Sequence, residues 1–195
     1  MKNTLRGMLV SLLLAAPMAA WAEPVSYTVD PVHSSITFTI RHLVSMVEGR
    51  FKSFEGTIAY DAADPKNSKV DFTVPADSIF TDNDGRDKHL KGADFFDVAK
   101  YPKLEFHSKK VIQRGKNLEV VGDLTMHGVT KGVSVTVTPL GTSPHPMGGT
   151  VAGFKTEFDV NRKDFGIVYN KVLDGGTSML GDEVSVRILV EAGHK

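Results

Sequence analysis

The segment VSVTVT at residues 133–138 alternates valines with small hydroxylated residues without a break. A period of two is typical of a β-strand with one buried and one solvated face, because successive side chains point to opposite sides of the sheet. Valine and threonine also favour strands. The segment therefore predicts a half-buried strand.

The same alternation recurs on both sides of this segment, in runs that turn-forming residues separate. The runs lie at 25–29, 36–40, 47–60, 70–74, 104–108, 118–126, 154–160 and 184–190. Turns rich in Asp, Asn, Pro or Gly are expected at 61–69 and 115–117, a tight connection at His127-Gly128-Val129-Thr130, and an irregular loop at 141–149. Gly49 and Gly56 interrupt the longest run, where they predict a bulge or a bend.

About eight strands joined by short turns predict an all-β fold in which neighbouring strands are antiparallel. An even number of such strands closes naturally into an extended eight-stranded barrel. A two-sheet sandwich shows the same alternation and stays an alternative at this level. No repeat of fixed period and no linker divides the chain, so residues 23–195 are predicted to form a single domain.

One short helical insert is predicted from the stretch DGRDKHL at residues 84–90. Asp84 is expected to cap its start and Gly92 to end it. Helical spacing puts Arg86, His89 and Leu90 on one face, which we expect to pack on the barrel.

Residues 1–22 read as a cleaved signal peptide. Lys2 and Arg6 precede the apolar run 8–16, and Ala-Trp-Ala at 20–22 is a small-x-small cleavage site. The apolar run is too short to span a bilayer as a helix. We therefore expect an exported, periplasmic protein without stable membrane insertion.

Composition narrows the partners further. The chain has 23 basic and 23 acidic residues, and loss of Lys2 and Arg6 would leave a net charge of −2. Charges of both signs are mixed, which argues against a nucleic-acid partner. There is no cysteine, and the seven histidines show no ligand spacing, so neither a disulfide nor a metal site is predicted.

The interior of an eight-stranded barrel is either just filled or holds one small ligand. The residues in the inward phase are strongly aromatic. They are Phe38, Phe51, Phe54, Phe72, Phe106, Phe154 and Phe158. His42 and Arg162 share the apolar phase, and a buried charge needs a partner. These two, with Arg86 and His89, are expected either to pair with acidic neighbours or to meet an anionic ligand head.

Five sequence blocks are similar to the YceI-like family, and together they cover nearly all of the chain after residue 22. The blocks are Asp30-Pro-x-His33-Ser34 with Phe38-x-Ile40-Arg41-His42-Leu43, Arg86-Asp87-x-His89-Leu90-Lys91-x-x-Asp94-Phe95-Phe96-Asp97, Tyr101-Pro102, Gly122-Asp123-Leu124-Thr125-x-His127-Gly128-Val129-Thr130, and Arg162-x-Asp164-Phe165-Gly166.

This resemblance implies a lipocalin-like barrel that holds a polyisoprenoid or other amphiphilic lipid non-covalently in an apolar tunnel, for transport, storage or sequestration, with no other cofactor. The expected ligand-binding residues are His42, Arg86, His89, Arg162, Phe38, Phe106, Phe154 and Phe158.

Two other functions stay open at this level. One is an enzyme acting on a bound hydrophobic substrate, a hydrolase or an isomerase, although no nucleophile elbow or metalloprotease motif is present and no catalytic residue is assigned. The other is a structural or stress protein with a filled core. A homodimer is left open.

Overall fold

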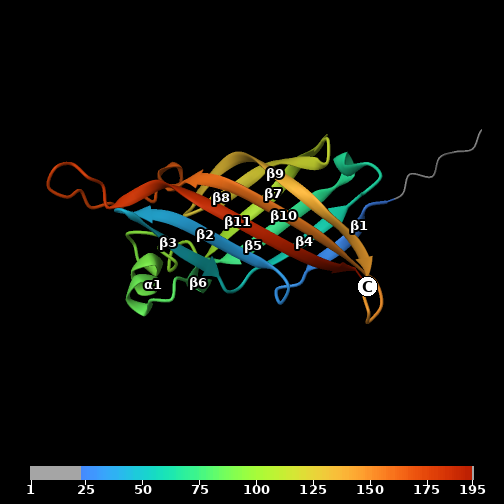
Figure 1. Cartoon of the computed structure of the whole chain (residues 1–195), viewed down its shortest axis with the longest axis horizontal. Helices are drawn as coiled ribbons and strands as arrows, with labels where there is room; N and C mark the ends of the chain where they lie inside the picture. The colour runs from blue at the N-terminus through green and yellow to red at the C-terminus, as the bar shows by residue number, and fades with distance from the viewer. Residues whose placement is uncertain (1–22, 195) are drawn as a thin grey trace, which may run out of the picture.

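A computed structural model describes residues 23–194, so the predicted signal peptide lies outside the described residues. This described part of the chain contains eleven strands and one α-helix (Figure 1). The strands are β1 (Val25–Val29), β2 (Ser35–His42), β3 (Ser45–Phe51), β4 (Glu55–Tyr60), β5 (Lys69–Pro75), β6 (Ile79–Phe80), β7 (Lys103–Arg114), β8 (Asn117–Met126), β9 (Val129–Pro144), β10 (Thr150–Asn161) and β11 (Leu180–His194). The helix α1 is Asp84–Lys91, and three 3-10 turns are η1 (Pro65–Asn67), η2 (Ala76–Ser78) and η3 (Arg162–Phe165).

Eight of the strands close into an elongated barrel (Figure 1). They follow the order β1-β4-β5-β7-β8-β9-β10-β11, and every pair is antiparallel. The circle closes where β1 returns to β11, with Thr28 opposite Gly193 and Val29 opposite Ala192. The predicted eight-stranded antiparallel barrel is thereby confirmed, and the sandwich is excluded.

The long strand β11 changes its partner along its length. Its last residues pair with β1, whereas Leu180 and the residues from Val184 to Leu189 pair with β2. The hairpin β2–β3 and the short β6 therefore extend the wall at the end of the barrel that carries α1. The single strand expected over 47–60 is wrong for this reason: β3 pairs with β2 and β6, but β4 pairs with β1 and β5.

The helix α1 forms where it was predicted, but its start and its buried face differ. Asn83, not Asp84, is the N-cap, and its side chain accepts a hydrogen bond from the backbone N–H of Arg86. The buried residue is Asp87, which accepts from the backbone N–H of Thr81 at 2.9 Å. The packing face was therefore predicted wrongly for Arg86 and His89, both of which are exposed, while Leu90 packs against the core.

Two connections decide how the later strands meet. His127 and Gly128 both have positive φ, 51° and 74°, which gives the tight β8–β9 hairpin turn that the sequence predicted. The irregular loop expected over 141–149 is shorter than predicted, because β9 continues to Pro144 and pairs with β10 there. Among the described residues, no helix has the length and hydropathy needed to cross a membrane.

Candidate functional site

The barrel encloses a cavity of about 270 Å³ with an almost wholly apolar lining, to which every barrel strand except β1 contributes. On β8 the lining extends from Leu118 to Met126. Eight residue steps correspond to about 27 Å along the strand, or roughly 20 Å along the axis of a barrel with typical strand tilt. The cavity is therefore long and narrow, and its length along the barrel axis exceeds the ~15 Å depth of one leaflet of a bilayer's hydrocarbon core.

Glycines on β3 and β4 leave space that aromatic rings of the adjacent strands occupy. A Cβ atom on Gly49 would lie 2.3 Å from Cζ of Phe38, its cross-strand neighbour, and one on Gly56 would lie 3.0 Å from Cδ2 of Phe72. Both glycines lie in regular register, so the bulge or bend predicted for them is wrong. The missing side chains make room for the rings at the wall, and this leaves the centre of the barrel open.

Four predicted phenylalanines, Phe38, Phe106, Phe154 and Phe158, all line the cavity. Phe154 is buried, with 6% of its surface exposed, while the other three are half-buried. The strand alternation therefore placed these rings on the correct face.

Arg162 also lines the cavity, but its guanidinium group is engaged with the protein itself. Nε donates to the carbonyl of Gly181 at 2.9 Å, and Nη1 donates to the carbonyls of Ile167 and Tyr169, both at 2.8 Å. Nη2 lies 3.3 Å from Oδ1 of Asp182. Burial lowers the pKa of Arg162 and the carboxylate of Asp182 opposes this. The geometry is that of a clamp joining η3 to the start of β11.

The three remaining predicted residues lie outside the cavity lining. His42 is half-buried at the end of β2. Arg86 is exposed and donates from Nε and Nη2 to the hydroxyl and carbonyl oxygens of Thr81, at 2.7 and 2.6 Å. His89 is exposed, and its Nε2 lies 2.9 Å from Oδ2 of Asp94. Head-group binding by His42, Arg86 and His89 stays a prediction.

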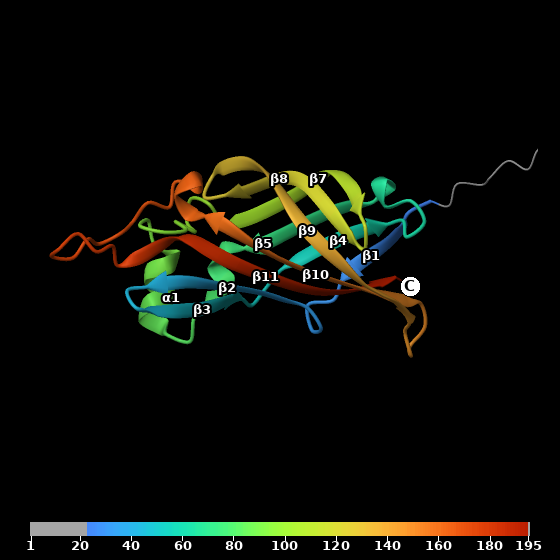
Figure 2. The same ribbon diagram turned by 45° about the horizontal axis from the view of Figure 1, so that its top comes forward.

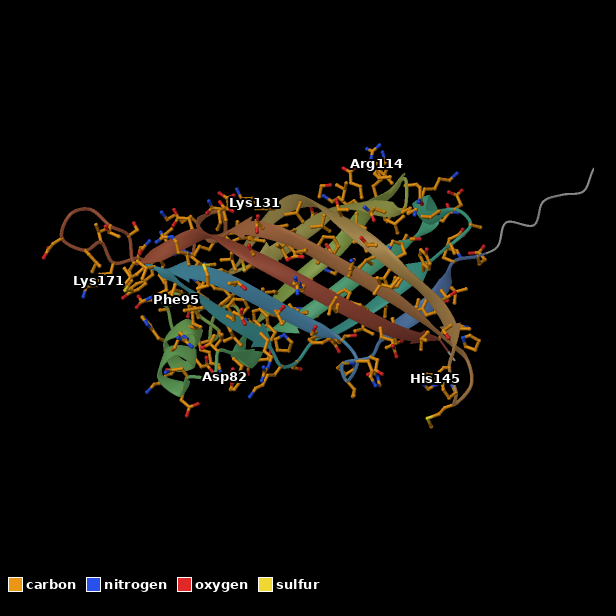
Figure 3. All side chains as sticks on the ribbon, in the orientation of Figure 1. Asp82, Phe95, Arg114, Lys131, His145 and Lys171 are labelled. Carbon is orange, nitrogen blue, oxygen red and sulfur yellow. The ribbon has the colours of Figure 1, made fainter. Side chains whose placement is uncertain are left out.

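The segment around α1 supplies lining residues that sequence reasoning did not assign. Leu90, Phe95 and Phe96 reach the cavity from this segment, and Phe95 lies between α1 and the barrel end (Figure 3). Phe95 packs on His89 and Tyr169, with ring centroids 5.0 and 5.1 Å apart. The signal was present as two adjacent phenylalanines in an otherwise polar stretch, but helical spacing alone did not show which way they point.

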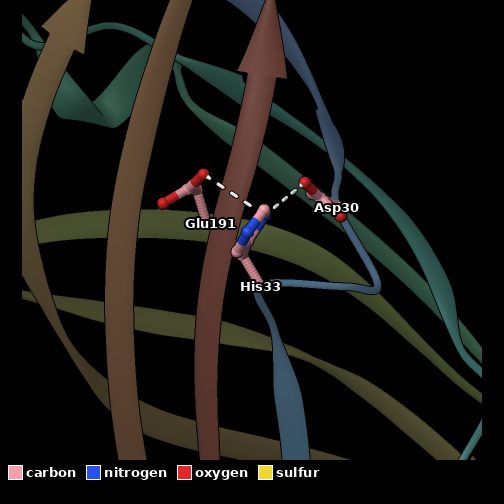
Figure 4. Close-up of side chains that lie close together, drawn as sticks. All are labelled: Asp30, His33 and Glu191. Atoms are coloured by element: carbon pink, nitrogen blue, oxygen red, sulfur yellow. Dashed lines mark hydrogen bonds and ion pairs between the residues drawn. The ribbon is translucent and has the colours of Figure 1, made fainter. Parts of the chain in front are cut away.

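A separate cluster joins the β1–β2 turn to β11 (Figure 4). Nδ1 of His33 lies 2.8 Å from Oδ2 of Asp30 and 3.8 Å from Oε1 of Glu191. The hydrogen bond raises the pKa of His33 and lowers that of Asp30. Asp30 also accepts from the backbone N–H of Val32 at 2.8 Å. These three side chains are close enough to hold a metal ion, but they already contact one another and so join the exposed β1–β2 turn to β11.

Polar atoms elsewhere in the buried parts of the fold are satisfied. In residues 23–194 no buried side-chain nitrogen or oxygen atom lacks a hydrogen-bond partner. Ser68, for example, borders the cavity, but its hydroxyl oxygen accepts from the backbone N–H of Asp61. The interior therefore offers a ligand hydrophobic contact rather than hydrogen bonds.

Comparison with known proteins agrees with this geometry. The family model for the YceI-like domain matches residues 27–192. A curated relative, Protein YceI of Escherichia coli O6:H1, is 38% identical over 168 residues, which cover 86% of this chain and 88% of that protein.

Two solved structures show the same fold. The YceI protein of Campylobacter jejuni has a TM-score of 0.69 at 30% identity, over 80% of this chain and 90% of that one. A domain from Saccharophagus degradans, described as polyisoprenoid-binding, has a TM-score of 0.64 at 14% identity, over 88% and 99% of the two chains. At this low identity the second likeness shows the fold alone.

Proposed function

The chain belongs to the YceI-like family, and from this premise and its cavity we propose that it binds a polyisoprenoid or similar long-chain amphiphile inside the barrel. The observation that carries the proposal is a long cavity with an almost wholly apolar lining. Such a cavity accepts a hydrocarbon chain and leaves a polar head in water, since it offers a head no free hydrogen-bond partner. The polyisoprenoid-binding description of a domain with the same fold supports a prenyl chain.

Burial of the chain supplies enough free energy for useful affinity. At about 0.8 kcal/mol per CH₂ group, ten buried groups contribute about 8 kcal/mol, which alone corresponds to a micromolar Kd. Ordering the chain and losing its translational freedom subtract from this sum. A longer chain would bind more tightly without any specific contact.

We infer binding rather than catalysis. An enzyme acting on the chain would need an acid, a base or a nucleophile that faces it, whereas the surface of this cavity is almost wholly apolar. Together with the predicted signal peptide at 1–22, this supports a periplasmic carrier or store for a lipid too insoluble to cross water alone. Hydrolase or isomerase activity and a filled structural core are the alternatives that the experiment must separate.

Native mass spectrometry of the protein, purified from its own periplasm without detergent, tests the proposal. We expect an additional mass that solvent extraction identifies as an intact prenyl or acyl lipid. Leu124→Trp should reduce its occupancy, because Leu124 lines the cavity. Thr125→Trp is the matched control on the other face of β8, where Thr125 shares a hydrogen bond with Thr130. A protein that stays lipid-free after incubation with prenyl diphosphates, quinones and fatty acids would contradict the proposal, and cleaved lipid would favour the enzyme.

A further inference from the structure

The barrel wall is interrupted between β9 and β10. The first part of β9, up to Val137, pairs with β8, and only the part from Val137 onward pairs with β10. The last rung joins Val137 to Thr156, so residues 157–161 of β10 pair with β11 alone. Five residues correspond to about 17 Å of strand without a backbone partner on this side. Figure 2 shows the two strands together toward the C-terminal end of the barrel and apart toward the other end.

Both ends of this interruption are held in place. At one end the hydroxyl of Thr156 donates to the carbonyl of Thr136 at 2.9 Å. At the other end η3 brings the carbonyl of Phe165 within 3.1 Å of Nδ1 of His127, in the β8–β9 turn. Val129, just after that turn, packs against the cluster that contains Phe165. The interruption therefore has fixed ends. We call it the β9–β10 window, and it lies between residues 157–161 of β10 and the part of β9 that precedes Val137.

Side chains, not backbone, close the window. Phe158 and Val160 approach it from β10 and Val133 from β9, and all three line the cavity while only half-buried. Phe158 reaches across to pack on the cluster that contains Val135. Phe154 points to the same face of β10 four residues earlier, but it lies in the paired part of the strand and is buried. Phe158 is therefore more exposed than Phe154 on the same strand.

Opening the window needs less free energy than opening the end that carries α1. That end is covered by Phe95 and Phe96 and tied by the four hydrogen bonds of Arg162. Separating those groups would leave buried polar atoms without partners. Along the window no inter-strand ladder has to break, and a rotation of Phe158 is a fast side-chain motion.

We propose that the β9–β10 window is the portal through which the hydrocarbon chain of a lipid enters and leaves the cavity, with Phe158 as its gate. This inference rests on the proposed function, since it names how the same cavity is loaded. A chain can slide in sideways along the window while its polar head stays in water, where Ser134, Glu157 and Asp159 are exposed.

A covalent lock across the window tests the portal, and the absence of native cysteine means that only the introduced thiols react. Ser134→Cys with Asp159→Cys puts two exposed thiols on opposite rims, for joining with a short bis-maleimide. The control joins Glu157→Cys to Arg187→Cys, an exposed pair across the intact β10–β11 ladder. Loading and release of a fluorescent polyene fatty acid are measured by stopped flow.

We expect the window lock to slow both loading and release by about tenfold or more, and the control lock to change neither rate. A window-locked protein that exchanges the probe as fast as the control would overturn the portal. If the unmodified protein binds no probe, no prenyl diphosphate and no quinone, it is the proposed function that fails.

Substitution of the gate gives a second test without cross-linking. Phe158→Leu should speed both rates several-fold, because the smaller side chain no longer spans the window. Phe154→Leu removes the same ring from the lining of the paired wall, and we expect it to weaken binding without faster loading. Equal rates in the two variants would remove Phe158 from the gating role.

Discussion

Replacing Gly49 by alanine tests whether glycine keeps the cavity open. The three atoms nearest to a Cβ at this position all belong to the ring of Phe38, at 2.3, 2.9 and 2.9 Å. Contacts below 3 Å cannot persist, so the ring must move. The cavity that Phe38 lines offers the ring space, so the ring should swing inward.

The expected effect on stability is moderate. Overpacking a well-filled core destabilises a protein by about 1–3 kcal/mol. Because the cavity gives the ring somewhere to go, we expect the lower part of this range, about 1–2 kcal/mol, and a fall in Tm of about 2–8 °C for a domain of this size. The displaced ring should also shorten the longest chain that the barrel binds.

Thermal unfolding followed by circular dichroism measures the first effect, and binding of a chain-length series of fatty acids measures the second. Gly132→Ala is the matched control, because a Cβ there meets no atom within 4 Å, so the variant should be neutral or slightly stabilised. Adding Phe38→Leu to Gly49→Ala should recover much of the loss in a double-mutant cycle. The reasoning is refuted if Gly49→Ala matches Gly132→Ala in stability and chain length, or if Phe38→Leu gives no recovery.

Three further substitutions probe the charged residues. Arg162→Met should lower the free energy of unfolding by about 3–5 kcal/mol in urea titrations, because it leaves buried carbonyls unpaired; unchanged stability would refute the clamp. Arg86→Ala should weaken anionic-headed ligands more than neutral ones in calorimetry, and equal losses would remove Arg86 from the head-group site. His33→Gln should lower Tm most between about pH 4 and 6.5. The pKa of His33 is raised in the folded protein, so its contribution to stability is lost as the pH rises through the pKa of His33. The pKa of Asp30 is lowered, so its contribution to stability is lost as the pH falls through the pKa of Asp30. A difference in Tm that does not depend on pH would contradict the ion pair.

The sequence by itself determined the elements that depend on neighbours along the chain. Period-two alternation identified most of the strands and placed Phe106, Phe154 and Phe158 on the inner face, since strand geometry alone sends alternate side chains to one side. His127-Gly128 marked a tight turn because few residue pairs accept positive φ at both positions. The short helix was visible from its spacing and its flanking polar residues.

Only the tertiary structure decided features that depend on which distant segments meet. Strand partners are one example: β3 and β4 read as one run, but they separate because each finds different neighbours. Arg162 is another example. Its position in the strand alternation shows that it points inward, but not that its guanidinium group contacts three backbone carbonyls and Asp182. The β9–β10 window is the last, because alternation continues unbroken through Phe158 and only strand pairing in space shows where the ladder ends.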